Sequence, residues 1–316
     1  MQKYQLDSDI SCGHGRRKIG YYFAHLKWEQ MVAGVAGGAV TTAVLHPLDL
    51  AKTRLQVNEG NAVVKARPRS SRFSGTLLEI YRARGFFGFY QGVTPNLLGN
   101  AVSWGLYFFL YGALKNYAQG GDPSKKLSIA CYFGYSSMSG IAILWMTNPI
   151  WVAKTRMCLQ YETLDAPGRL TTWGTLRSIW LTEGLRGLYR GMVPGMVGVS
   201  NGALQFLFYE EFRNFYNSFH GRPIDTHLNV PEYLLMGTLS KTLAVAATYP
   251  YQVVRTRLQE QHRNYGTMTN LVKTIFRYEG VFGFYKGLLP NILRTAPACG
   301  LTFVVYENCY KCLKAL

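Results

Sequence analysis

The stretch His46–Gln56 reads HPLDLAKTRLQ, and the chain contains two further copies of this pattern. They are NPIWVAKTRMC at Asn148–Cys158 and YPYQVVRTRLQ at Tyr249–Gln259. Each copy has a proline at its second position: Pro47, Pro149 and Pro250. Copies about a hundred residues apart indicate that the chain is a threefold repeat of one unit, each long enough for several helices or strands.

A second pattern recurs in step with the first. It reads RGFFGFYQG at Arg84–Gly92, EGLRGLYRG at Glu183–Gly191 and EGVFGFYKG at Glu279–Gly287. Two motifs in a fixed order divide the chain into repeats. The predicted organisation is an N-terminal tail 1–27 and repeats 28–126, 127–229 and 230–316.

The composition favours a membrane protein. Apolar residues make up 48% and charged residues 16%, below the roughly 25% of charged residues usual in soluble domains. Six long segments are dominated by apolar residues: Trp28–Val57, Thr94–Ala118, Leu127–Gln160, Pro194–Phe219, Val230–Gln261 and Pro290–Leu316. Only helices or closed barrels span a bilayer, and alternation of period two is absent. We therefore expect an all-α membrane protein with six transmembrane helices.

A shorter segment lies between the two motifs of each unit. The three are Phe73–Arg84, Leu170–Thr182 and Met268–Tyr278. The first has apolar residues at helical spacing, which is typical of an amphipathic helix on a membrane surface. We expect three such short helices.

The charge distribution, the histidines and the cysteines argue against several classes of function. The formal charge is +17, and most Lys and Arg residues lie in 51–92, 154–191 and 255–287, a bias typical of loops on one side of a membrane. A nucleic-acid-binding protein would show a basic face without apolar spans. The six histidines have no recurrent acid or serine partner, and the six cysteines follow no metal or disulfide pattern. We therefore expect no catalytic residue, no metal site and no nucleic-acid partner, and the N-terminus shows no secretory signal.

The proline motif predicts a gate. A proline inside a helix kinks it, and the second and fifth residues after the proline share one face. These residues are Asp49 and Lys52, Trp151 and Lys154, and Gln252 and Arg255. Charges at membrane depth are costly unless they are paired or face water. Contacts between the three kinked helices could close a pore, although a solvated helix end with ordinary salt bridges is the simpler alternative.

The tripled pattern Pro-x-acid-x-x-base-x-base, followed by acid-Gly-x-x-x-x-aromatic-base-Gly, resembles the mitochondrial carrier family over residues 28–316. The resemblance implies six transmembrane helices and three matrix helices in a multi-pass protein of the mitochondrial inner membrane. It also implies alternating access by a monomer, a membrane lipid partner such as cardiolipin, and no bound cofactor.

The resemblance also implies two gates, in which residues of neighbouring repeats pair. On the matrix side the implied contacts are Asp49–Lys154 as an ion pair, Trp151–Arg255 as a cation–π contact and Gln252–Lys52 as a hydrogen bond. A cation–π contact contributes about 0.5–2 kcal/mol. On the cytoplasmic side the implied ion pairs are Lys115–Glu210 and Arg213–Glu307, with Tyr310 uncharged.

The substrate site implied by the resemblance lies on the second long helix of each repeat. Equivalent positions after the second motif are Gly99, Gly198 and Arg294. Gly198 with Val199 fits the family pattern for adenine-containing ligands, but a shorter interval to Glu210 leaves the register on that helix open. Arg294 is a permanently charged donor for phosphate or carboxylate. The alternatives are that the glycines serve helix packing and that Arg294 forms a structural ion pair.

The Pro-x-Trp variant at Trp151 resembles the subgroup that carries NAD, FAD, folate and pyrimidine nucleotides. The expected substrate is FAD and/or folate, with NAD or a pyrimidine nucleotide as the alternative. These ligands combine a flat heteroaromatic ring with an anionic tail. Trp104, Asn201 and Gln205 would complete such a site through stacking and hydrogen bonds.

Overall fold

The computed structural model describes residues 28–58, 73–119, 129–160, 171–221, 229–261 and 265–315. The predicted tail 1–27 and the predicted first repeat boundary at residue 126 lie outside these ranges. The described residues form helices and turns without any strand. They divide into two compact units, one within Met1–Val40 and Leu301–Leu316 and the other within Thr41–Gly300.

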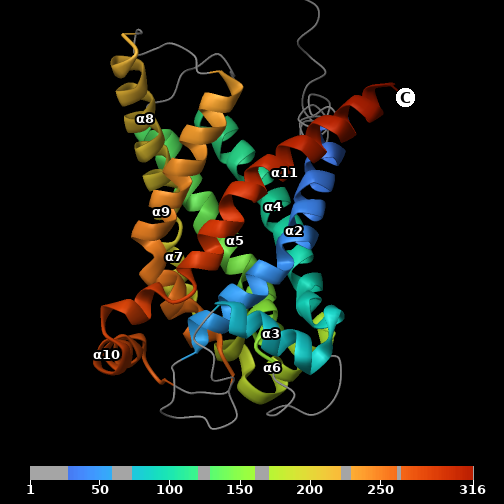
Figure 1. Cartoon of the computed structure of the whole chain (residues 1–316), viewed down its shortest axis with the longest axis vertical. Coiled ribbons are helices and arrows are strands. Elements are labelled where there is room, and N and C mark those ends of the chain that lie inside the picture. Colours follow the sequence, from blue (N-terminus) through green and yellow to red (C-terminus); the bar gives the residue numbers. More distant parts are fainter. Residues whose placement is uncertain are drawn as a thin grey trace, which may run out of the picture. The chain divides into compact units, whose positions relative to one another are not determined.

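The helices follow the order that the repeats predict (Figure 1). The first long helix of each repeat contains the motif proline: α2 (Trp28–Val57), α5 (Ile129–Cys158) and α9 (Val230–Gln259). The second long helices are α4 (Val93–Gln119), α8 (Ser200–Phe219) with the short α7 (Met192–Val197) before it, and α11 (Leu288–Ala315). The helices between them are α3 (Phe73–Arg84), α6 (Thr172–Leu188) and α10 (Met268–Glu279), and the 3₁₀ helices η1 (Phe86–Tyr90) and η2 (Val281–Tyr285) follow the first and third of these.

The second motif is a turn that requires glycine. Gly85, Gly184 and Gly280 have φ of 63°, 63° and 64°, each with ψ near the fully extended value. This combination is open essentially to glycine alone. The recurring glycine therefore turns the chain from each short helix toward the next long one.

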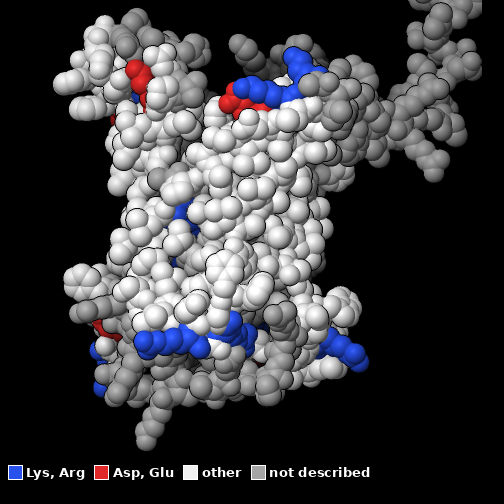
Figure 2. Space-filling view, turned by 45° about the vertical axis from the view of Figure 1, so that its right-hand side comes forward, with Lys and Arg blue, Asp and Glu red and all other residues white. Residues whose placement is uncertain are grey.

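The short helices are amphipathic. Each buries two equivalent residues, for example Leu271 and Ile275 on α10. The turns that follow expose large apolar side chains, with Phe87 at 76% and Phe282 at 87% exposed. Figure 2 shows Lys and Arg near the lower edge, at the level of the short helices, below a broad surface nearly without charged groups. Such an arrangement is typical of helices lying at a membrane surface.

Two segments of the described residues, Phe86–Gln119 and Val281–Lys314, are long and apolar enough to cross a membrane on length and composition alone. Close helix packing is visible at Gly37, where an added Cβ would lie 3.1 Å from the carbonyl oxygen of Thr302. Close packing of α2 against α11 thus explains why position 37 is a glycine.

The fourth long helix is interrupted between α7 and α8. The backbone N–H groups of Gly198 and Val199 donate to the carbonyls of Gly195 and Met196, at 3.0 and 3.1 Å. These are the three-residue spacings of a 3₁₀ turn, which is wound more tightly than an α-helix. The tighter turn lies in the repeat whose interval to Glu210 is shorter than in the other two.

Candidate functional site

The C-terminal ends of the three proline-containing helices form a closed ring. The second basic residue of each motif donates through Nε to a main-chain carbonyl of the next first helix. These bonds are Arg54 to Cys158 at 3.2 Å, Arg156 to Gln259 at 3.3 Å and Arg257 to Gln56 at 2.9 Å. The acceptors occupy equivalent positions in the three repeats, so the ring follows the threefold pattern of the sequence.

Side-chain contacts reinforce two sides of this ring. Thr155 donates to Gln259 Oε1 at 2.8 Å, and Thr256 donates to Gln56 Oε1 at 2.9 Å. Gln56 also donates through Nε2 to the hydroxyl of Tyr249 at 3.0 Å. The ring therefore joins α2, α5 and α9 to one another at one end of the molecule.

The same arginines bind the acid of the second motif. In the third repeat Arg257 contacts both oxygens of Glu279, each at 2.8 Å, and Lys286 contacts Glu279 at 2.8 Å. The Arg257 side chain is 0% exposed and that of Glu279 is 6% exposed.

In the second repeat Arg156 contacts both oxygens of Glu183, at 2.6 and 2.9 Å, and Arg190 contacts Glu183 at 3.2 Å. Two-point arginine–carboxylate contacts are strong and fix geometry, so they hold α6 and α10 to the ring.

The first repeat departs from this arrangement because Arg84 replaces the acid and Gln91 replaces the base. Gln91 Oε1 accepts from Arg54 at 2.9 Å. Its Nε2 donates to the carbonyls of Met157 at 2.6 Å and Gln160 at 3.0 Å. A neutral amide thus does the linking that a carboxylate with two cations does in the other repeats.

The second-motif carboxylates Glu183 on α6 and Glu279 on α10 are held ionised. Burial raises the pKa of Glu279, but the hydrogen bonds and charges of Arg257 and Lys286 outweigh it and leave the pKa below the ordinary value. The pKa of Glu183 is lowered in the same way, with Arg156 and Arg190 opposing the effect of burial.

The sequence interpretation missed these ring arginines as functional residues. It considered the second and fifth positions after each proline, whereas the ring uses the seventh. The signal was present, since the second base of the base-x-base pattern recurs in all three repeats as Arg54, Arg156 and Arg257.

Lys52, two residues before the ring arginine Arg54 on α2, makes the contact that the sequence predicts. Its Nζ donates to Gln252 Oε1 at 3.1 Å, which is the expected contact between α2 and α9. It also donates to Asn291 Oδ1 on α11 at 3.0 Å. Whether this contact works as a gate stays a prediction.

Asp49 has a different partner from the one expected. Its Oδ1 lies 3.0 Å from Nε of Arg294 on α11, whereas an ion pair with Lys154 was expected. Asn96 on α4 also donates to Asp49, at 3.4 Å. Asp49 therefore forms its ion pair with Arg294 in this conformation, while the charge of the expected partner Lys154 also acts on its carboxylate.

The expected contact of Arg255 with Trp151 is also replaced. Lys154, on the same helix as Trp151, places Nζ 5.2 Å from the indole centroid. Arg255 donates instead to Asn148 Oδ1 at 3.5 Å. The lysine lies three residues after the tryptophan, so it shares its face and covers the ring first.

The three predicted substrate positions each contact the first helix of the following repeat. An added Cβ on Gly99 would lie 3.3 Å from the Trp151 ring, and one on Gly198 would lie 2.7 Å from the Tyr251 ring. Arg294 makes the equivalent contact with Asp49. The predicted substrate residues and the predicted gate residues are therefore in direct contact.

The other predicted substrate residues differ in their surroundings. Val199 packs against Gly140 on α5, since a Cβ there would lie 3.1 Å from Val199 Cγ1. Asn201 donates to Thr248 Oγ1 on α9 at 2.7 Å. Trp104 is 61% exposed and Gln205 is half-buried. The 3₁₀ turn at Gly198 shows where the fourth long helix changes its winding, and the register of the substrate site on this helix stays a prediction.

At the other end, the predicted cytoplasmic gate residues make local contacts. Glu210 pairs with Arg213 on its own helix at 2.8 Å, and Lys115 lies 5.9 Å from the centroid of the Tyr132 ring. The expected Lys115–Glu210 pair is thus not formed in this conformation. In the other compact unit, Glu307 pairs with Lys311 at 2.8 Å and Tyr310 stacks on Tyr306.

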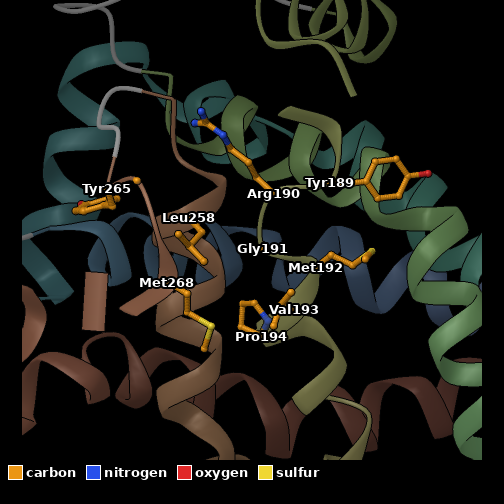
Figure 3. Close-up of a pocket in the computed structure, with 10 residues that line it drawn as sticks. Tyr189, Arg190, Gly191, Met192, Val193, Pro194, Leu258, Tyr265 and Met268 are labelled. Atoms are coloured by element: carbon orange, nitrogen blue, oxygen red, sulfur yellow. The ribbon is translucent and has the colours of Figure 1, made fainter. Parts of the chain in front are cut away.

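A pocket of about 220 Å³ lies between the second and third repeats. Figure 3 shows its two sides, formed by the stretch from Tyr189 to Pro194 and by Leu258, Tyr265 and Met268. The lining combines glycine backbone with apolar side chains and Arg190.

Comparison with known proteins places the chain. The family model described as mitochondrial carrier protein matches residues 25–122, 125–220 and 226–315. The chain belongs to the mitochondrial carrier family. Its fold is therefore the all-α carrier fold of three repeats and six transmembrane helices. That the ring of arginines faces the matrix stays a prediction from the resemblance.

Individual relatives cover nearly the whole carrier. The chain is 40% identical to Folate transporter 1, chloroplastic, of Arabidopsis thaliana, over 92% of this chain and 97% of the relative. It is 35% identical to Nicotinamide adenine dinucleotide transporter 1, chloroplastic, of the same plant, over 89% and 90%. It is 34% identical to the Mitochondrial FAD carrier protein FLX1 of Saccharomyces cerevisiae, over 89% and 95%.

Proposed function

We propose that this carrier moves FAD and/or folate between cytosol and mitochondrial matrix by alternating access across the inner membrane. The observation that carries the proposal is Arg294, a cation 31% exposed at the level where each repeat contacts the next. Relatives named for folate and FAD transport, at 40% and 34% identity, support the same substrates.

The chemistry of the site suits a ligand with a flat ring and an anionic tail. Arg294 offers a planar guanidinium that binds a carboxylate or phosphate at two points. The aromatic rings of Trp151 and Tyr251 lie at the same level as Arg294. They could stack on a flavin or pterin ring once their contacts with Gly99 and Gly198 open. Transport involves no covalent step, so the protein acts as a carrier and not as an enzyme.

A NAD or pyrimidine nucleotide carrier is the second candidate. It is favoured by the NAD transporter at 35% identity and by the diphosphate that NAD shares with FAD. Folate has a glutamate tail instead, so comparing these ligands separates diphosphate from carboxylate recognition.

A lipid is the second partner that we propose. Cardiolipin would place a phosphate in the pocket beside Arg190 and its acyl chains against the exposed apolar residues Val193 and Met268. Loss of the thermal stabilisation by added cardiolipin in an Arg190→Ala variant would support this role. The carrier itself would act as a monomer.

The transport proposal is tested with liposomes that contain the purified protein. Uptake of labelled FAD, folate, NAD and a pyrimidine nucleotide is measured for the wild type, Arg294→Lys and Arg294→Ala. We expect weak uptake with lysine, which keeps the charge but loses the planar fork, and little or none with alanine. Arg277→Ala, on the exposed face of α10, is the matched control and should transport normally.

Normal uptake by Arg294→Ala would refute a substrate contact at this arginine. Thermal unfolding of the same samples separates a lost contact from a lost fold. Arg294→Ala also removes the ion pair with Asp49, but Lys52 and Lys154 still act on that carboxylate, so the empty carrier should still unfold cooperatively at a modestly lower temperature.

A further inference from the structure

The ion pair of Asp49 joins the predicted gate residues to the predicted substrate residues. Asp49 lies on α2 among the gate residues, and Arg294 lies on α11 at the substrate level, with Oδ1 and Nε 3.0 Å apart. The Asp49 side chain is 7% exposed and that of Arg294 is 31% exposed. The arginine is therefore accessible to a ligand, while the carboxylate approaches it from the protein side.

The geometry of this ion pair is poor for a hydrogen bond. Nε of Arg294 is buried and has no aligned hydrogen-bond acceptor, although the Asp49 oxygen is close. An anion that met the guanidinium in its plane would form two aligned, charge-assisted bonds. A ligand carboxylate or diphosphate can therefore replace Asp49 with a net gain in hydrogen bonding.

Asp49 also has other cations nearby. The charges of Lys52 and Lys154 both act on its carboxylate, in addition to Arg294. Breaking a buried ion pair is costly mainly because it leaves one charge uncompensated. Here the remaining lysines lower that cost, so the aspartate can give up the arginine without moving into water.

We propose that Asp49 is a built-in competitor for the transported anion: it occupies Arg294 in the empty carrier, and the anionic group of the substrate displaces it. This inference rests on the proposed function, since it assumes that the substrate anion binds Arg294. Displacement releases a gate residue of α2 when the site is filled, and so links substrate binding to the gate.

The competition also provides selectivity. The apparent affinity of any anion for Arg294 falls in proportion to the fraction of carriers in which the arginine is free. A small anion gains nothing else from the site, so Asp49 weakens its binding. A ligand with a flat ring gains additional stacking and overcomes the same competition.

The experiment measures ligand binding to the purified carrier by thermal shift, which does not depend on transport. The probes are inorganic diphosphate, glutamate, FAD and folate, and the variants are Asp49→Asn, Arg294→Ala and the double variant. If Asp49 occupies the arginine in about nine of ten empty carriers, Asp49→Asn should bind diphosphate and glutamate on the order of tenfold more tightly. The double variant should lose this gain, because the two residues act on one another.

Glu211→Gln is the matched control, since it removes one negative charge on the exposed face of α8. An equal gain in this control would overturn the inference, because net charge would then explain the effect. Unchanged or weaker binding by Asp49→Asn would overturn it too, as would a gain that persists without Arg294. Asp49→Ser replaces Asp49→Asn if the amide variant does not fold.

The outcomes also separate this inference from the transport proposal. If FAD and folate leave the wild type unstabilised while diphosphate binds as described, the substrate assignment fails and the competition at Arg294 stands. If FAD or folate binds but neutralising Asp49 changes nothing, the assignment stands and the competition fails.

Discussion

The contact between Arg257 and Glu279 offers the sharpest stability test. Both side chains are almost fully buried, at 0% and 6% exposed, and two 2.8 Å bonds join them. Glu279→Gln keeps the shape but removes the charge that Arg257 and Lys286 share. Removing one partner of a buried ion pair costs about 3–5 kcal/mol.

The Arg156–Glu183 pair in the second repeat is the less buried pair and serves as the comparison. Glu183 is 23% exposed, so water compensates part of the loss in Glu183→Gln. Hydrogen bonds to charged groups contribute about 1.5–3 kcal/mol, and we expect the lower part of that range here. Lys311→Gln removes an exposed pair on one helix turn, worth about 0.3–0.5 kcal/mol, and is the control.

The assay is thermal unfolding of the purified carrier in detergent. At roughly 2 °C per kcal/mol, Glu279→Gln should lower the unfolding temperature by about 6–10 °C. Glu183→Gln should lower it by less and Lys311→Gln by almost nothing. Equal shifts for Glu279→Gln and Lys311→Gln would refute the idea that the ring arginines and the short-helix acids hold this end of the carrier together.

Three further predictions follow from the same contacts. Gly198→Ala would place its Cβ 2.7 Å from the ring of Tyr251, and this overpacking should lower the free energy of unfolding by about 1–3 kcal/mol, as measured by thermal unfolding. Gly99→Ala, whose Cβ would lie 3.3 Å from the ring of Trp151, should lower it by less. Arg84→Glu restores the acid that the first repeat lacks and should raise the unfolding temperature by about 2–4 °C; a decrease would show that the glutamine arrangement is the more stable one. Because the pKa of Glu279 is lowered by folding, its stabilising effect should be complete above pH 4.5 and be lost as the pH falls through the folded pKa, so that a pH series flattens in Glu279→Gln.

The helices could be predicted from the sequence because the repeats supply the same signals three times. The short helices begin at or close to the predicted residues, and α2 spans Trp28–Val57 as expected. The turn glycines explain why the second motif recurs, since their backbone angles are restricted to glycine.

The partners of the site residues could be predicted only in part. Lys52 and Gln252 meet as expected, because the repeat fixes their common level. The partner of Asp49 could not be predicted, since Lys154 and Arg294 both carry positive charge and only the distance between helices decides between them. The position of the 3₁₀ turn at Gly198 could not be predicted either. The shorter interval between the second motif and Glu210 indicates an irregularity in this repeat without specifying where it lies.

The central claim is that this carrier transports a ligand with a flat ring and an anionic tail, FAD and/or folate. The most direct measurement is the initial rate of uptake of labelled FAD, folate, NAD and a pyrimidine nucleotide into liposomes that contain the wild-type protein, with empty liposomes as the blank. The account predicts saturable uptake of FAD or folate that exceeds the uptake of the other two ligands. Rapid uptake of NAD or the pyrimidine nucleotide, with neither FAD nor folate entering above the blank, would contradict it.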